Sequence, residues 1–314
     1  MAMTLADYAV QSSDPFDRGV LRRFGETSSL NRTMPWRKIS GQSFQYRVEE
    51  TLSGIEWRRV NQGYTESTGT WSSRREDVML LGGEFFVDRA LRRFQRTSGD
   101  SVDLIAEQAS MKARALSREL ERAVLEGDPL VDPDEMMGLR ARLTGTQVLV
   151  AGVGGATLTV AMVDSLLDAV SHDVGKVHLV MNKLTRNKLT TLVTAATGAV
   201  RINYDSISDV GERIQRYDGF PIVVIEDDWD ASTILDAEDP GDGTADTYSM
   251  YAVAFGVEEG VHGLLNGDGP MVDCYQVTKE TETGPPGEKW RIECYPGMAM
   301  KHPRSAARLR AFSL

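Results

Sequence analysis

A glycine-rich turn is the first pattern in the sequence that could carry chemistry. Gly152, Gly154 and Gly155 follow residues 146–150, an apolar stretch that predicts a strand. In a dinucleotide-binding turn, such glycines let the backbone approach a pyrophosphate, which meets the N-terminus of the next helix. Here the third glycine is misplaced for that spacing, and the next helix is predicted to begin only near Thr159. We therefore expect a flexible turn, with a nucleotide-dependent enzyme as the alternative.

An acidic stretch at residues 226–247 could offer oxygen ligands to a divalent cation. Calcium loops place such ligands at defined spacing and usually end on a bidentate Glu. In this stretch the spacing is irregular and no Glu stands at the expected end. A solvated loop is the favoured interpretation, and a cation site remains the alternative. The acids are Glu226, Asp227, Asp228, Asp230, Asp236, Glu238, Asp239, Asp242 and Asp246.

Groups for acid–base or nucleophilic catalysis are sparse. The four histidines have no Ser, Cys or Asp companions that suggest a triad. Asp164 and Asp168 lie one turn apart on a predicted helix, where they fit its polar face better than a catalytic pair. The sequence therefore predicts no catalytic residue, no cofactor and no metal site. The histidines are His172, His178, His262 and His302.

The two cysteines fit a reducing compartment and exclude a scaffold built on disulfides. Cys274 and Cys294 lie at matching distances from Gly284, the centre of a predicted hairpin, so the pattern places them opposite each other. As thiols they would act as small buried apolar residues, and a disulfide formed after cell lysis is the alternative.

Composition and charge narrow the class of protein. The chain has 314 residues, of which 41% are hydrophobic and 26% charged, as in globular proteins. No apolar run approaches the ~18 residues of a membrane helix. The net charge is −11, and residues 130–270 hold 22 acids against nine bases. This balance limits non-specific association and is the opposite of that expected for a sequence-specific DNA-binding protein.

The N-terminal quarter of the chain lacks the pattern of a self-contained core. Residues 1–36 have little period and predict an extended arm with a short helix near residues 19–24. Such an arm must be ordered by something it lies against. Residues 37–76 alternate polar and apolar positions and predict a long hairpin that carries aromatic and arginine side chains. Because a two-stranded hairpin is marginal alone in water, we favour an arm that docks on a neighbour over an ordinary surface hairpin.

A strand and one long helix follow the hairpin. Residues 78–87 predict a strand with a bulge or turn at Gly82 and Gly83, which runs into an arginine-rich segment at residues 89–96. Apolar residues then recur every three or four positions up to Val124, and Gly127 ends the helix. Its cap is expected at Asp100 or Ser101. About 25 residues give ~38 Å of helix, enough to span a small domain.

The rest of the chain predicts an α/β block and a returning hairpin. Strands and helices alternate from residue 146 to residue 255, with Thr159 and Asn182 as helix caps. Residues 271–277 and 289–295 predict a second hairpin, and Lys301, Arg304, Arg308 and Arg310 form a basic tail.

This order of parts resembles the major capsid fold of tailed bacteriophages, which encapsulins share. Residues 217–224 resemble the glycine- and proline-bearing strand of the family's axial domain, and residues 252–256 its central strand. Residues 291–295 with 298–303 resemble the return to the peripheral domain. The resemblance implies an α+β chain. Its N-arm would be residues 1–36, its extended β-hairpin loop 37–76 and its α/β axial domain 129–270. The peripheral domain would be residues 77–128 and 271–314, with its long spine helix at about 101–126.

The resemblance also implies a function without catalysis. The chain would be a structural subunit that forms pentamers and hexamers of an icosahedral head around double-stranded DNA. An encapsulin-type compartment is the alternative with the same fold. The implied partners are other copies of the chain, a separate scaffolding protein, a portal, a decoration protein, and DNA through non-specific contact, with no membrane. The implied location is the virion, after assembly in the host bacterial cytoplasm. Contacts between subunits are expected from Trp57, Arg58, Arg59, Tyr64, Trp71, Arg74 and Arg75.

Overall fold

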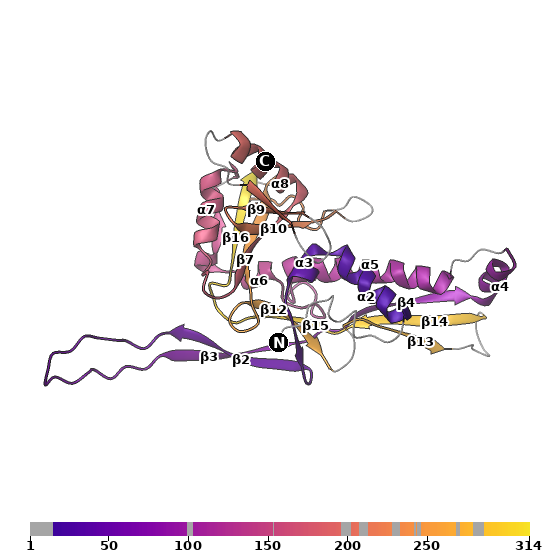
Figure 1. Ribbon diagram of the computed structural model, residues 1–314, viewed down its shortest axis with the longest axis horizontal. Coiled ribbons are helices and arrows are strands. Elements are labelled where there is room, and N and C mark those ends of the chain that lie inside the picture. The colour runs from indigo at the N-terminus through magenta and orange to yellow at the C-terminus, as the bar shows by residue number, and fades with distance from the viewer. Residues whose placement is uncertain are drawn as a thin grey trace.

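The computed structural model consists of a projecting hairpin, a long helix over a small sheet, and an α/β block above them (Figure 1). It describes residues 15–98, 103–152, 154–195, 202–206, 213–227, 233–241, 243, 246–267, 271–278 and 286–314.

The long helix α5 (Leu104–Glu126) is the element on which the lower half of the molecule is built. Its N-cap is Asp103, whose side chain accepts a hydrogen bond from the backbone of Ile105 (3.1 Å). The cap expected at Asp100 or Ser101 is therefore wrong, because the helix begins later. Gly127 ends the helix as predicted. The predicted apolar stripe is buried along its whole length, and its members are Ile105, Ala109, Ala113, Leu116, Leu120 and Val124.

The N-terminal segment is helical where it is described, which corrects the expectation of an extended arm. Helices α2 (Pro15–Thr27) and α3 (Ser29–Thr33) pack against α5. Leu21, Phe24 and Leu30 are each at most 2% exposed and share one core with α5. The expectation that something must order this segment is met by the chain's own helix. Residues 1–14 lie outside the described part.

A three-stranded sheet lies beside α5, in the order β13 (Asp273–Thr278), β14 (Gly287–Cys294), β4 (Leu81–Asp88). It confirms the predicted returning hairpin. Strand β4 pairs with β14 without any register shift, so the bulge expected at Gly82 and Gly83 is absent from this strand. Gly82 instead permits close approach, since a Cβ there would lie 2.5 Å from the carbonyl oxygen of Ile292. The arginine-rich segment after β4 forms α4 (Arg89–Ser98).

The cysteines are not directly opposite each other. Cys274 pairs with Ile292, so Cys294 stands two residues farther along β14. Both side chains are buried and no disulfide joins them, and burial raises the pKa of Cys294. They therefore behave as small apolar core residues, as the reduced form was expected to do.

The α/β block is centred on a mixed sheet in the order β1-β12-β11-β7-β10-β9-β8, with β15 paired to β12, and β16 paired to β11, β5 and β6. Its strands are β1 (Trp36–Ile39), β5 (Val148–Val150), β6 (Ala156–Thr157), β7 (Lys176–Asn182), β8 (Ile202–Ser206), β9 (Arg213–Tyr217), β10 (Phe220–Ile225), β11 (Tyr248–Phe255), β12 (Val261–Asn266), β15 (Pro296–Met300) and β16 (Ala306–Ser313).

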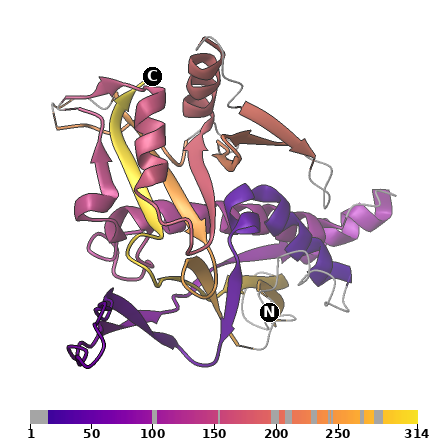
Figure 2. The same ribbon diagram turned by 60° about the vertical axis from the view of Figure 1, so that its left-hand side comes forward.

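Two capped helices flank this sheet as predicted. The side chain of Thr159 caps α7 (Val160–Asp168), which lies along the yellow strand β16 in Figure 2. Asn182 caps α8 (Lys183–Ala195) by accepting a hydrogen bond from the backbone of Thr185 (2.8 Å). Two shorter helical segments, α6 (Leu139–Arg142) and a 3-10 turn (Gly145–Gln147), lead from α5 into the block.

The prediction of a basic tail at the C-terminus is wrong, because most of this segment forms strand β16 inside the large sheet. Arg308 is 5% exposed, and its guanidinium contacts Ser249 (3.0 Å) and the carboxylate of Glu238. Glu238, 70 residues earlier in the chain, thus compensates the buried charge of Arg308. Residues 271–314 consequently serve both layers, with β13 and β14 in the small sheet and β15 and β16 in the large one.

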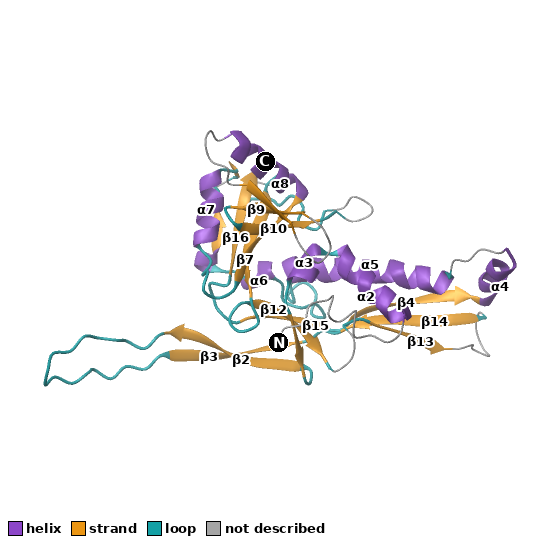
Figure 3. Cartoon of the chain, viewed as in Figure 1, coloured by secondary structure: helices purple, strands orange, loops and turns teal. Residues whose placement is uncertain are grey.

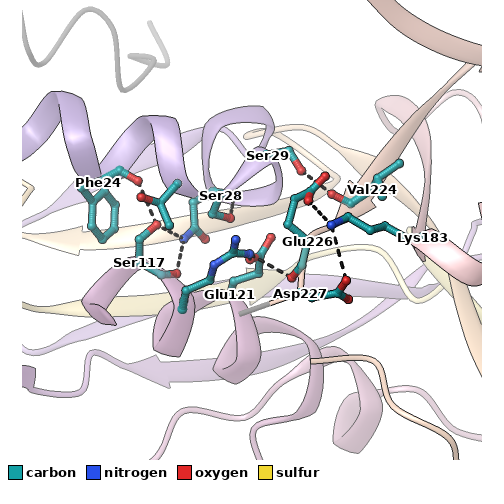
Figure 4. Close-up of polar contacts among 12 residues, drawn as sticks. Phe24, Ser28, Ser29, Ser117, Glu121, Lys183, Val224, Glu226 and Asp227 are labelled. Atoms are coloured by element: carbon teal, nitrogen blue, oxygen red, sulfur yellow. Dashed lines mark hydrogen bonds and ion pairs between the residues drawn. The ribbon is translucent and has the colours of Figure 1, made fainter. Parts of the chain in front are cut away.

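A buried polar junction joins α2, α3 and α5 (Figure 4). Ser117 on α5 donates to the carbonyl oxygen of Phe24 (2.8 Å), and its own carbonyl accepts from the amide of Asn31 (2.9 Å). These bonds satisfy groups that would otherwise be buried without partners. They fix the N-terminal helices on α5.

The same junction reaches the α/β block through charged groups. Glu121 on α5 is fully buried and is 3.1 Å from Arg118, which also donates to the carbonyl oxygen of Glu226 (3.0 Å). Ser29 donates to the carbonyl oxygen of Val224 at the end of β10 (2.7 Å). Burial raises the pKa of Glu121 to about 7, although Arg118 opposes the shift.

This raised pKa predicts how stability depends on pH. Between the ordinary Glu pKa of about 4.5 and the folded value of about 7, the folded state keeps a proton that the unfolded state has lost. Glu121 should therefore contribute on the order of 3 kcal/mol below pH 4.5, and that contribution should be lost as the pH rises through 7. Urea unfolding at several pH values should show a flatter profile for Glu121→Gln than for the native chain. Glu119→Gln, on the exposed side of the same helix, is the control, and equal slopes for all three proteins would contradict the prediction.

Candidate functional site: the projecting hairpin

The projecting hairpin is built from two antiparallel strands, β2 (Ser43–Thr51) and β3 (Thr70–Asp77). Between them residues 52–69 form a long tip drawn as loop in Figure 3. The hairpin predicted at residues 37–76 is thus confirmed, except that residues 37–39 belong to β1, which pairs with β12 in the large sheet.

The base of the hairpin is held by a small apolar core of its own. Tyr46 and Val48 on β2 are 6% and 3% exposed. They point into a cluster that the large sheet completes, whose other members are Ile39, Val78, Leu264 and Ala299. Burying such side chains is worth about 1.5–3 kcal/mol each, which an isolated hairpin could not gain.

An ion pair closes the base on its polar side. Arg142 in α6 donates two hydrogen bonds to the carboxylate of Glu76 (2.5 and 2.6 Å) and a third to the carbonyl oxygen of Met298 (3.0 Å). Tyr46 lies within hydrogen-bonding distance of Glu76 (3.0 Å), and burial, with Glu76 adding to it, raises the pKa of Tyr46 to about 12. The Arg142 side chain is 6% exposed, so this bidentate pair is shielded from water. It fixes the direction in which the hairpin leaves the molecule.

The tip shows the opposite character. Its apolar side chains have almost no contacts within the chain, and the most exposed are Trp57 (102%), Ile55 (97%), Val60 (87%) and Leu52 (84%). A cluster of this size in solvent marks a surface that another molecule covers. The tip therefore has the composition of an interface rather than of a finished surface.

The residues predicted to make inter-subunit contacts all lie on this hairpin, but in two groups. Trp57, Arg58, Arg59 and Tyr64 are in the exposed tip, with the Arg58 guanidinium 5.1 Å from the ring centre of Tyr64. Trp71, Arg74 and Arg75 lie on β3. The guanidinium of Arg47 on β2 lies 4.6 Å from the ring centre of Trp71, and Arg75 pairs with Asp77 (3.0 Å). Arg74 stands opposite Tyr46 in the strand register. Their contacts with a neighbour remain a prediction.

Sequence reasoning missed the anchoring residues and Leu52. Arg142 is 66 residues from Glu76, and no local pattern connects the two. Leu52 follows the last paired residue of β2, so strand periodicity gives it no role.

The other candidate sites do not form reactive clusters. Gly154 and Gly155 adopt positive φ values of 73° and 89°, and strand β6 separates them from α7, so no helix N-terminus meets this turn. Asp164 accepts a hydrogen bond from the hydroxyl of Tyr217 (2.6 Å), a structural role. Among the described residues no group of three or more His, Cys, Asp or Glu side chains could hold a metal ion. Within the same residues no helix is long and apolar enough to cross a membrane.

Comparison with known proteins decides the fold. Residues 33–159, which include the hairpin and α5, match the family model of the major capsid protein GP7. The structure is similar to the holo-SrpI encapsulin complex of Synechococcus elongatus PCC 7942, with a TM-score of 0.65 and 13% identity over 90% of this chain and 87% of that one. It is equally similar to the capsid of a native GTA particle, with a TM-score of 0.65 and 14% identity over 92% and 91%. The chain has the major capsid fold.

The structure is also similar to a solved structure of Mycobacterium phage Bobi, with a TM-score of 0.60 and 13% identity over 91% of each chain. No curated protein matches in sequence. The fold confirms the α+β class and the resemblance drawn from the order of parts.

The anchor at the base of the hairpin is testable in the isolated subunit. Arg142→Ala leaves the Glu76 carboxylate nearly buried without its cation, which costs about 3–5 kcal/mol. Hydrogen exchange of the β2 and β3 amides should accelerate by at least about 100-fold, while α5 stays protected. Arg75→Ala is the control because its exposed pair with Asp77 is worth at most about 1 kcal/mol. Equal exchange in the two variants would show that the pair does not hold the hairpin.

Proposed function

We propose that this chain is the major capsid subunit of a tailed bacteriophage, whose copies form the pentamers and hexamers of an icosahedral head around double-stranded DNA. The observation that carries the proposal is the hairpin, whose base is locked and whose apolar tip lies in solvent. The match of residues 33–159 to the major capsid protein GP7 model supports the same role. The head would be part of the virion and would assemble in the host bacterial cytoplasm.

The shape of the subunit supports assembly into closed shells. The hairpin leaves one end of the molecule, and α4 with the small sheet lies at the other end (Figure 1). A contact between unlike ends repeats from copy to copy and closes into a ring when the rotation allows. The GTA particle capsids to which the chain is similar were computed with C5 symmetry.

The remaining partners follow from the same proposal. A separate scaffolding protein, a portal and a decoration protein would complete the head, and DNA would be held without sequence preference. The net charge of −11 fits loose contact with packaged DNA, since a tight DNA-binding protein needs a basic surface. The proposed role needs no catalytic group.

An encapsulin-type compartment is the second candidate, and one observation favours it. The similarity to the SrpI encapsulin is as high as that to the GTA capsid, with a TM-score of 0.65 for both. The chain should therefore be produced alone and imaged by electron microscopy. Uniform closed shells that hold a protein cargo would favour the compartment, whereas capsomers, or shells without cargo, would favour the phage head. A chain that stays monomeric at every concentration would contradict both.

The tip of the hairpin gives a direct prediction about assembly. Replacing Ile55, Trp57 and Tyr64 by Ser should leave the subunit folded, because all three are exposed. Each buried apolar side chain is worth about 1.5–3 kcal/mol, so the concentration at which capsomers form should rise at least about 100-fold. Sedimentation velocity measures this concentration, and circular dichroism checks the fold.

Leu184→Ser is the matched control for that triple variant, since Leu184 is an exposed apolar residue on α8, away from the hairpin. It should assemble like the native chain. Unchanged assembly of the triple variant would show that the tip is not an interface.

A further inference from the structure

A histidine is buried beneath the base of the projecting hairpin. His262 lies on β12 opposite Ala299 of β15, and its side chain has no exposed surface. Both strands lie next to the base of the hairpin (Figure 1). Leu264, two residues farther along β12, belongs with Ala299 to the apolar cluster of that base. Because side chains two residues apart share one face of a strand, His262 lies on the face that carries the hairpin.

Phe44 is the hairpin residue that meets this histidine. It is the second residue of β2, and its ring lies edge-on to the ring of His262, with 6.2 Å between the ring centres. The guanidinium of Arg37 lies 4.7 Å from the centre of the Phe44 ring, and the ammonium of Lys301 lies 5.9 Å from it. Cations at such distances are attracted to an aromatic ring. The base of the hairpin is therefore packed among two cations and one group that can become a third.

The imidazole of His262 is held in its neutral form. Its Nδ1 lies 3.4 Å from the carbonyl oxygen of Gly260, and because a carbonyl oxygen only accepts, Nδ1 carries the proton of the neutral ring. Nε2 is buried and has no hydrogen-bond partner among the described residues. A second proton would have to sit there, as a charged donor without an acceptor. Burial, with the charges of Lys301 and Arg37 adding to it, lowers the pKa of His262 to about 4.

The charges that the sheet presents to His262 favour the neutral ring. Arg37 comes from β1 and Lys301 follows β15, and both positive charges act against a second proton. Glu258 and Glu259, in the turn that precedes β12, act on Lys301.

The hairpin side adds a phenyl ring to this site. Phe44 is the residue of β2 that contacts the imidazole. The titratable groups of the base are Tyr46 and Glu76, which lie within hydrogen-bonding distance of each other, and Glu76 is bound by Arg142 on the polar side of the base.

We propose that His262 is an acid-sensitive latch for the projecting hairpin: a proton on the imidazole loosens Phe44 from β12, and the hairpin loses its fixed direction. The neutral ring packs against Phe44, whereas an imidazolium would add a third cation to a buried site that already holds two. Residues 40–42 join β1 to β2, so the hairpin can swing while β1 stays paired with β12. As regulation of a docking hairpin, this inference rests on the proposed function.

The direction of the effect follows from the two states of the hairpin. In the open state His262 is exposed and has its ordinary pKa of about 6.5, whereas in the latched state the pKa is about 4. Above pH 6.5 both states are neutral and the latch has its full strength. As the pH falls from 6.5 towards 4, the open state takes up the proton first and gains population. From about pH 7.5 to about pH 5, the opening equilibrium should shift on the order of 30-fold.

A global measurement would mix this effect with that of Glu121. The raised pKa of Glu121 favours the folded state at acid pH, which is the opposite direction. Glu121 lies on α5, at the junction with α3, and has no part in the base of the hairpin. Hydrogen exchange of the β2 and β3 amides separates the two effects, because it reports the opening of the hairpin itself.

The test compares protection factors of the β2 and β3 amides at about pH 7.5 and about pH 5, in the unassembled subunit. In the native chain these factors should fall on the order of 30-fold. His262→Phe keeps a ring beside Phe44 but cannot take up a proton, so its factors should fall at most about 3-fold. His262→Leu repeats the test with a smaller side chain, in case the phenyl ring does not fit.

His178→Phe is the matched control. His178 is also buried with a pKa that burial lowers, but it lies on β7, two strands away from β12. Its variant should lose hairpin protection at acid pH as the native chain does.

Two results would overturn the latch. One is an equal fall of the protection factors in the native chain and in both His262 variants, because other groups at the base would then cause the acid response. The other is an equal fall in α5 and in the hairpin, because the whole chain would then have opened. Both results leave the proposed function standing, since the exchange measurement involves no assembly. A native chain that never assembles would refute the proposed function without changing the exchange result.

Discussion

The direction of the projecting hairpin depends on one shielded ion pair, that between Arg142 and Glu76. A hairpin of this length has no core along its outer half, and it can point in a fixed direction only if its base is rigid. The two hydrogen bonds from the guanidinium, the nearby Tyr46 hydroxyl and the carbonyl of Met298 supply that rigidity. Removing water from the pair strengthens these contacts, because the side chains are only 6% and 15% exposed. Burying the pair costs desolvation free energy. In return the hairpin has a fixed direction, which the proposed docking on a neighbour requires.

The second constraint is the sharing of α5 by every other part. Its apolar stripe covers the small sheet and the N-terminal helices, and Arg118 near its middle reaches the carbonyl of Glu226 in the α/β block. Glu121 is buried at that meeting point with one carboxylate oxygen that lacks a hydrogen bond among the described residues. Burial favours the protonated form of such an acid, so the stability of the junction depends on pH.

Local features of the fold could be predicted from the sequence, and long-range ones could not. The apolar period of α5, the caps Thr159 and Asn182 and the alternation in β2 depend on residues within one turn or one strand, and all are confirmed. The N-terminal helices and β16 were misread because their burial depends on distant partners. The charge of Arg308, which suggested a tail, is neutralised by Glu238, 70 residues earlier in the chain. For the same reason the exposed tip was predictable by composition, whereas its anchor at Arg142 was not.

A density map of the assembled particle tests the central claim most directly, because it shows where the hairpin apex lies. The account predicts that Trp57, which is fully exposed in the single subunit, is buried against a neighbouring copy and that every copy shows the same contact. An ordered particle in which Trp57 and the rest of the tip still lie in solvent would contradict it.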